Sequence, residues 1–360
     1  MLLSNTSKGN VAKIDSDGNV GYLPEMKYFK GPKALLKKGL KAADDFRAVA
    51  AYTNENIVFT SSVFAIVPQD IAQASEYSLM VLKVLPAFFN SKLFIYFTLS
   101  SSSSAGVDRT RIYFDEFLAF PIALNPKYIT RVSEIVEMLH SLNKEKLALM
   151  KNPDVFLDEE AIQYKTQKCA TLSSEIDELL YKCYGIDETE IALIDYAVKI
   201  ALPVLKRGEE TGYKGSNIFS PLKIAFEKDK AFLFSYASVY VNHFKQLFNS
   251  QDRFFRVEIH VTTDYIGCHF LVDLQTSGKE RISFPESTEK ALMDIIGNLS
   301  IYEISRDLYI QQDVRGFNKT SFYVIKPNER KAWHTAVAHH DLLEFIEALT
   351  TSEPQIIGAL

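Results

Sequence analysis

Residues 255–274 read FRVEIHVTTDYIGCHFLVDL, and this stretch decides the fold of the C-terminal part of the chain. It contains two runs in which apolar and polar residues alternate. Because successive side chains of a strand point to opposite faces, the two runs predict an antiparallel hairpin with one buried face. Helices expected over residues 230–248, 287–304 and 328–349, and a second hairpin over residues 308–325, complete a compact α+β unit.

The segment before this unit is helical. From about residue 130, apolar residues recur with a period of about 3.6, and Gly185 is placed to end a long helix. Asp187 and Glu190 have the spacing of a capping box, which predicts the start of the next helix. The first two helices have apolar faces suited to pairing as an antiparallel hairpin, and residues 208–217 form a polar linker that contains glycine.

The N-terminal segment mixes strands and helices. Residues 56–60 and 63–67 are β-branched and aromatic, which is typical of strands. Residues 77–97 predict a helix that restarts at Pro86, because proline suits a first helical position. The predicted fold class is therefore α+β. It has three parts: a mixed α/β module at residues 1–125, a helical spacer at 126–207, and an α+β domain at 208–352 with two antiparallel hairpins and flanking helices.

The charge balance of the chain limits its partners. Its 360 residues include 40 Lys and Arg against 45 Asp and Glu, and the net charge is −5. This excludes a uniformly basic nucleic-acid binder but leaves room for a local basic face. The three cysteines form no Cys-x-x-Cys pair, which argues against a disulfide framework and against a structural zinc site.

The most apolar run of the chain spans residues 79–99. Lysines, a proline and an asparagine interrupt it, so it predicts a buried helix rather than a membrane span. Residues 1–10 lack the basic and apolar regions of a secretory signal. We therefore expect a cytoplasmic protein with no membrane partner.

Common catalytic motifs are absent from the sequence. It has no glycine-rich nucleotide-binding turn, no G-x-S-x-G, no H-E-x-x-H and no protein-kinase set. The stretch Asn125-Pro126-Lys127-Tyr128 is similar to the Asn/Asp-Pro-Pro-Tyr/Phe loop of amino-methyltransferases. The lysine at its third position favours a helix-entry turn instead. No catalytic residue, cofactor or metal is therefore predicted in this chain.

Two short triplets keep a nuclease open as an alternative. One class of metal-dependent nuclease carries an acidic residue followed two positions later by lysine, and residues 25–27 (EMK) and 329–331 (ERK) fit this pattern. The second triplet lies at an expected helix start rather than on a strand. His334 and His339 are five residues apart, which places them on different faces of a helix, so this pair predicts no metal site. For His340 and the nearby carboxylates, a solvated or core-edge role is favoured over an inward-pointing metal site, which stays open as the alternative.

The most informative stretch is basic. Six lysines fall within fifteen residues, interleaved with aromatic residues and glycines: Lys27, Lys30, Lys33, Lys37, Lys38 and Lys41. Arg109 and Arg111 follow a loop rich in serine. Lysines along a loop and strand suit a phosphate backbone because each contact releases condensed counterions, and an arginine fork suits a guanine edge or a phosphate. The alternative is a solvated lysine face, which is the commoner fate of a charge run.

An ordered series of motifs resembles a known DNA-recognition region. The motifs of the N-terminal part are residues 28–33 (YFKGPK), 36–39 (LKKG), 49–52 (VAAY), 57–63 (IVFTSSV), 85–93 (LPAFFNSKL), 101–104 (SSSS) and 120–122 (FPI). In this order they resemble the target-recognition region (the TaqI-like specificity domain) of N6-adenine DNA methyltransferases of restriction-modification systems. Residues 176–186 (IDELLYKCYGI) resemble the helix that follows this region, and residues 326–333 (KPNERKAW) resemble the far C-terminus of some larger members.

The family's methyl-donor loop and catalytic motif lie upstream of the matched region, and this chain starts after them. The resemblance therefore implies sequence-specific recognition of duplex DNA without methyl transfer. It implies that S-adenosylmethionine binds only to a separate catalytic partner, which would be a methyltransferase or restriction subunit. The residues expected to contact DNA are Lys30, Lys33, Lys37, Lys38, Lys41, Arg109 and Arg111.

Two other functions stay open at this point. The first is a metal-dependent nuclease that acts through the C-terminal domain, for which Glu329 is the candidate residue. The second is a protein-interaction scaffold that uses the helical spacer, because residues 151–200 hold an excess of acidic over basic residues.

Overall fold

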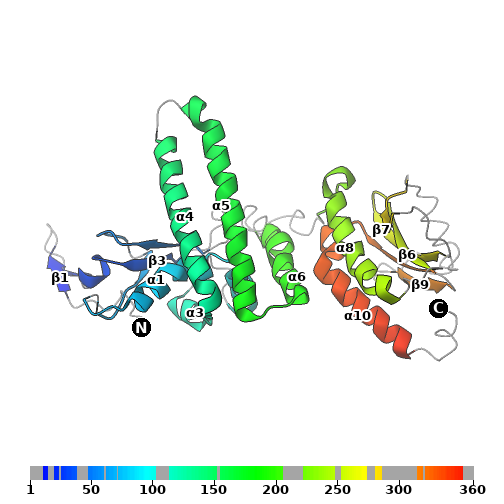
Figure 1. Ribbon diagram of the computed structural model, residues 1–360, viewed down its shortest axis with the longest axis horizontal. Helices are drawn as coiled ribbons and strands as arrows, with labels where there is room; N and C mark the ends of the chain where they lie inside the picture. The colour runs from blue at the N-terminus through cyan, green and yellow to red at the C-terminus, as the bar shows by residue number, and fades with distance from the viewer. Residues whose placement is uncertain are drawn as a thin grey trace. The chain divides into compact units, whose positions relative to one another are not determined.

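The computed structural model describes residues 11–14, 20–23, 26–38, 48–60, 62–70, 72–102, 113–151, 155–205, 222–247, 253–273, 280–285, 314–318 and 321–351. It is a mixed α+β structure (Figure 1). The contacts divide the chain into two compact units, Met1–Gly215 and Ser216–Leu360. Each unit has a hydrophobic core of its own.

The N-terminal unit contains a three-stranded antiparallel sheet. Strand β3 (Lys33–Lys37) lies at its centre, between β4 (Ala50–Thr53) and β5 (Val63–Ile66). Alternate residues of β3, Ala34 and Leu36, are buried in the core of the unit. A separate hairpin is formed by β1 (Val11–Ile14) and β2 (Val20–Leu23).

The prediction of a strand at residues 63–67 is confirmed by β5, but the prediction at residues 56–60 is wrong. Both edges of β3 are already occupied by β4 and β5. The backbone N–H of Ile57 instead donates to the carbonyl oxygen of Phe29 at 3.0 Å, which holds residues 56–60 as a loop beside another loop.

Two helices follow the sheet, α1 (Glu76–Phe89) and α2 (Lys92–Ser101). The predicted helix at residues 77–97 is therefore interrupted, but the expectation of a restart at Pro86 is wrong because Pro86 lies inside α1. The second helix begins after Ser91, whose hydroxyl oxygen accepts a hydrogen bond from the backbone N–H of Phe94 at 3.1 Å. A capping serine satisfies a free helical N–H, which proline does not do.

No single helix among the described residues is long and apolar enough to cross a membrane. The pair α1 and α2, bent by 67°, meets the same test of length and composition when it is taken together. Most buried side chains of this pair belong to the core of the N-terminal unit.

The predicted helical segment is present and forms a hairpin. Helix α4 (Pro126–Met150) lies beside α5 (Val155–Tyr184), as Figure 1 shows. Helix α3 (Phe114–Ala119) precedes the hairpin, while α6 (Glu188–Tyr196) and a short π-helical turn (Ala197–Ala201) follow it. The N-terminal part of α4 and the C-terminal part of α5 share one core with the N-terminal sheet and α1. Residues of the predicted recognition module and of the predicted spacer thus pack into one unit.

The predicted helix signals in this segment are confirmed. Gly185 has a φ of +68°, the left-handed conformation that suits a helix end. The side chain of Asp187 accepts hydrogen bonds from the backbone of Thr189 and Glu190, and the Glu190 side chain accepts one from the backbone of Asp187. This reciprocal capping box begins α6.

The C-terminal unit is built on a five-stranded sheet with the order β8-β6-β7-β10-β9. The strands are β6 (Phe254–Val261), β7 (Tyr265–Asp273), β8 (Ile282–Ser283), β9 (Val314–Asn318) and β10 (Ser321–Pro327). Both predicted hairpins are confirmed, because β6 pairs antiparallel with β7 and β9 pairs antiparallel with β10. The linker at residues 208–217 and the helix at residues 287–304 lie outside the described residues.

Helices cover one face of this sheet. They are α8 (Phe226–Leu247) and α10 (Thr335–Thr351), and a short 3-10 turn (Arg330–Trp333) precedes α10. The alternating residues that predicted the hairpin, among them Val257, Cys268 and Phe270, are buried against these helices. The aromatic pair Phe270 and Phe322 stacks with a ring-centroid distance of 4.4 Å.

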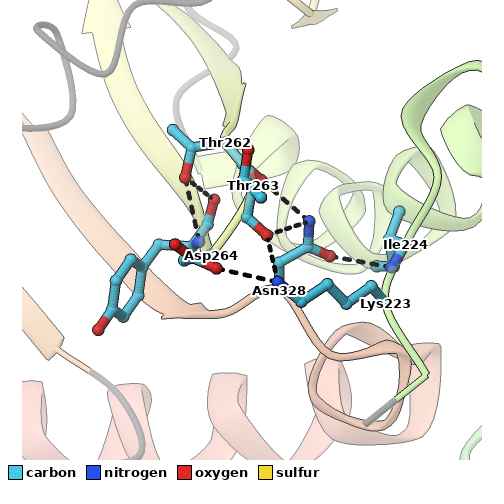
Figure 2. Close-up of polar contacts among 7 residues, drawn as sticks. Lys223, Ile224, Thr262, Thr263, Asp264 and Asn328 are labelled. Atoms are coloured by element: carbon cyan, nitrogen blue, oxygen red, sulfur yellow. Dashed lines mark hydrogen bonds and ion pairs between the residues drawn. The ribbon is translucent and has the colours of Figure 1, made fainter.

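The side chain of Asn328 ties three segments of the C-terminal unit together (Figure 2). Its Oδ1 accepts a hydrogen bond from the N–H of Ile224, just before α8, at 2.9 Å. Its Nδ2 donates to the carbonyl oxygen of Thr262 in the β6–β7 turn at 2.9 Å, and its own N–H donates to the carbonyl of Asp264 at 2.7 Å. Lys223 adds an ion pair with Asp264 at 2.9 Å. The motif that contains Asn328 therefore has a structural role.

Candidate functional site

The predicted DNA-contacting lysines surround strand β3, but Lys33 differs from the others. Its side chain is fully buried. Its Nζ donates hydrogen bonds to the carbonyl oxygens of Gly31 and Glu55, both at 2.7 Å. Burial lowers the pKa of the Lys33 ammonium. A buried ammonium that is held by two carbonyl groups is not positioned to contact a phosphate.

The remaining described lysines of this stretch are accessible to different degrees. Lys30 is exposed, whereas Lys37 and Lys38 are half-buried. Lys37 ends β3 and Lys38 follows it, so the two side chains point to opposite faces of the sheet. The Nζ of Lys38 lies 4.3 Å from the centroid of the Phe64 ring, a cation–π contact. The basic stretch is thus divided between two faces. Lys41, Arg109 and Arg111 lie outside the described residues.

Two surface loops flank these lysines and are joined to each other. We call residues 26–32, which begin with a short 3-10 turn (Met26–Tyr28), and residues 54–60 the paired loops. The N–H of Gly31 donates to Oδ1 of Asn56 at 3.1 Å, and the rings of Phe29 and Phe59 lie 5.2 Å apart. Sequence reasoning missed this element because it assigned residues 56–60 to a strand. The glycine and proline at positions 31 and 32 were the available signal for a loop.

The motif at residues 90–92 has a structural role in the N-terminal unit. The Asn90 side chain forms two hydrogen bonds with the backbone of Ala50, at 2.8 and 2.9 Å. The backbone N–H of Lys92 donates to the buried carboxylate of Asp177 in α5 at 3.0 Å. These contacts fix β4 to the end of α1 and α2 to α5, so they support the sheet that carries the lysines.

One group among the described residues brings three possible metal ligands together: His340, Asp341 and Glu344. Asp341 is buried and already forms ion pairs with Lys326 and Arg315, and it accepts a hydrogen bond from the hydroxyl of Tyr236 at 2.6 Å. Two neighbouring cations neutralise this carboxylate and repel a further positive charge. The group therefore does not suit a metal ion.

The second nuclease triplet also lacks a suitable arrangement. Glu329 precedes the 3-10 turn, and its carboxylate pairs with Lys331 at 2.9 Å. Residue 25 of the other triplet lies outside the described residues. Among the described residues, Glu329 belongs to no group of three or more possible metal ligands.

A polar cluster lies on the sheet face of the C-terminal unit opposite to α8 and α10. Arg256 pairs with both Glu258 and Asp273. Burial lowers the pKa of His260 and His269, although the charge of Glu258 opposes the shift. Both imidazoles are therefore neutral at physiological pH. The arginine is balanced by two carboxylates, so the cluster offers no net positive charge to a phosphate group.

No protein-family model, no curated protein and no solved structure matches this chain.

Proposed function

We propose that this chain is the sequence-specific duplex-DNA recognition part of a restriction-modification or related phage-defence system, and that it serves an adenine-specific DNA methyltransferase. The observation that supports the proposal best is the exposed and half-exposed set of lysines beside β3. Lys30 lies on a surface loop and Lys37 at the end of the central strand. Each phosphate that such a lysine neutralises releases condensed counterions, which favours binding independently of sequence.

In this proposal the N-terminal unit is the target-recognition module. Lys30 and Lys37 position the DNA backbone, together with Lys41 and with Arg109 or Arg111, while Lys38, which lies on the other face of the sheet beside the Phe64 ring, is not part of this contact. We leave Lys33 out of the contact set, because its ammonium is buried and bound to two carbonyl oxygens. A base edge or a nearby phosphate is the proposed target of the two arginines.

The helical hairpin gives this module a means to hold a partner. Helices α4 and α5 have 25 and 30 residues. Their end farthest from the shared core exposes Leu147 and Met150, at 55 and 56%. We propose that the hairpin spaces the recognition module from a methyltransferase or restriction subunit in the cytoplasm, and that S-adenosylmethionine binds to that subunit.

The contact assignment is tested by alanine substitution of Lys30 and Lys37 together. We expect binding to unrelated duplexes to weaken about equally, because phosphate contacts carry no sequence information. Lys127→Ala is the matched control, since Lys127 is an exposed lysine in the first turn of α4. Fluorescence anisotropy with labelled duplexes measures the affinities. Equal losses in the control and in the double variant would contradict the assignment.

The proposal that S-adenosylmethionine binds to a partner subunit is tested by isothermal titration calorimetry of the purified chain with this cofactor. We expect no saturable heat from the purified chain. Saturable binding to this chain alone would contradict the proposal that the cofactor belongs to a partner.

A further inference from the structure

The paired loops, residues 26–32 and 54–60, are joined by hydrogen bonds and by a contact between aromatic rings. Backbone and side-chain hydrogen bonds join Phe29 to Ile57 and Gly31 to Asn56, and the rings of Phe29 and Phe59 are in contact. Gly31 has a φ of +66°, which only glycine adopts without strain. The two loops therefore form one ordered surface element.

The buried side chain of Lys33 also connects the two loops. Its ammonium donates to the carbonyl of Gly31 in one loop and to the carbonyl of Glu55 in the other. Burying an ammonium without a carboxylate is unfavourable, and this one is bound by carbonyl groups within the described chain. The fold thus accepts a buried charge to fix the shape of two surface loops. Such a fixed shape is typical of surfaces that recognise a ligand.

The paired loops carry exposed apolar side chains as well as exposed polar and basic ones. The side chain of Val58 is 84% exposed, and that of Met26 is 60% exposed. Lys30 and Asn56 are exposed on the same pair of loops. The Oδ1 of Asn56 is occupied by the Gly31 N–H, so its NH2 group is the part that can donate to a ligand.

We infer that the paired loops read base sequence in duplex DNA, with Val58 as the specificity-determining contact. In the major groove, an apolar side chain packs against the thymine methyl group, and an amide donates to acceptor atoms on base edges. Val58 supplies the first kind of contact and Asn56 the second, while Lys30 contacts a phosphate beside them. Lys33 is a positioning residue that acts through the loops. This inference rests on the proposed function and names the element that distinguishes one DNA sequence from another.

The inference is tested by selecting preferred sites from a random duplex pool with the wild-type chain and with Val58→Ala. Val49→Ala is the matched control, because Val49 is an exposed valine (44%) of the same unit. In the site selected by the wild type, each thymine is then replaced in turn by uracil, which lacks the methyl group. We expect one such replacement to weaken wild-type binding about four-fold, the effect of one buried methyl-sized group.

The same replacement should leave the affinity of Val58→Ala unchanged, because the partner of the methyl group is already absent. The control Val49→Ala should behave as the wild type does. Three outcomes overturn the inference: no uracil replacement matters to the wild type, Val58→Ala shows the same uracil effect, or Val58→Ala selects the same site with the same preference. In each of these outcomes, salt-dependent DNA binding by the wild type would leave the proposed function standing. Absence of any DNA binding would overturn both.

Discussion

Lys33→Met should loosen the paired loops without unfolding the N-terminal unit. Methionine keeps most of the side-chain volume and removes the ammonium. Two charge-assisted hydrogen bonds are lost, at roughly 1.5–3 kcal/mol each. The unfavourable burial of the ammonium, an effective penalty of several kcal/mol, is removed at the same time. Because these terms nearly cancel, we expect the global free energy of unfolding to change by no more than about 2 kcal/mol.

The local effect should be larger, because the removed group is the one that joins the loops. The amide of Gly31 donates to Asn56 and the amide of Ile57 donates to Phe29, so both report on opening of the pair. If the free energy of local opening falls by about 2 kcal/mol, hydrogen exchange of these two amides accelerates about thirty-fold.

Hydrogen exchange followed by NMR measures this effect directly. The amide of Glu190 in the capping box of α6 is the internal control and should be unaffected. Unchanged exchange at Gly31 and Ile57 would refute the conclusion that Lys33 holds the paired loops together. A global loss well above about 4 kcal/mol would refute it too, because Lys33 would then support the core of the unit rather than its loops.

Three further predictions concern the C-terminal unit. Asn328→Ala should destabilise this unit by about 3 kcal/mol, since two hydrogen bonds are lost and the buried N–H of Ile224 is left unpaired. Lys223→Ala, at an exposed ion pair, should cost less than about 1 kcal/mol. Chemical denaturation compares the two variants. Asp341→Asn should cost about 3–5 kcal/mol, because it leaves a buried lysine without its anion, and a loss below about 1 kcal/mol would contradict the importance of this pair. The lowered pKa values of His260 and His269 mean that the unfolded state binds more protons than the folded state below about pH 6.5, so stability should fall on acidification. Replacing both histidines with glutamine should flatten this dependence, and an equal slope in the variant would contradict the assignment.

Much of the fold follows from local sequence patterns. The alternation around Val257 and Cys268 fixes which face of the C-terminal hairpin is buried, and Asp187 with Glu190 marks the start of α6. In both cases neighbouring residues decide the structure, either through the side-chain period of a strand or through a capping box.

The errors arise where contacts distant in sequence decide the structure. Residues 56–60 have strand-forming side chains, but the edges of β3 are occupied by other strands. The break between α1 and α2 combines a local contact, the cap of Ser91 on the N–H of Phe94, with a distant one, the bonds of Asn90 to Ala50, forty residues earlier in the chain. At residues 56–60, strand propensity is overruled by tertiary pairing.

The candidate site was predictable only in part, because burial of a lysine depends on contacts that its neighbours in sequence do not reveal. Sequence spacing identifies a basic stretch but does not reveal which lysine is buried. Lys33 carries the same charge as Lys30, and it is buried only because Gly31 and Glu55 place their carbonyl groups around its ammonium. A residue that a charge pattern assigns to DNA thus has a structural role, and the loops that it holds were not visible as a site.

The central claim is that this chain binds duplex DNA through phosphate contacts. It is tested most directly by anisotropy of a labelled random duplex pool, titrated with the purified chain at several salt concentrations. The logarithm of the association constant should fall linearly with the logarithm of the salt concentration. The combined alanine substitution of Lys30 and Lys37 should reduce that slope by about two. Binding that does not depend on salt, or no binding at low salt, would contradict the claim.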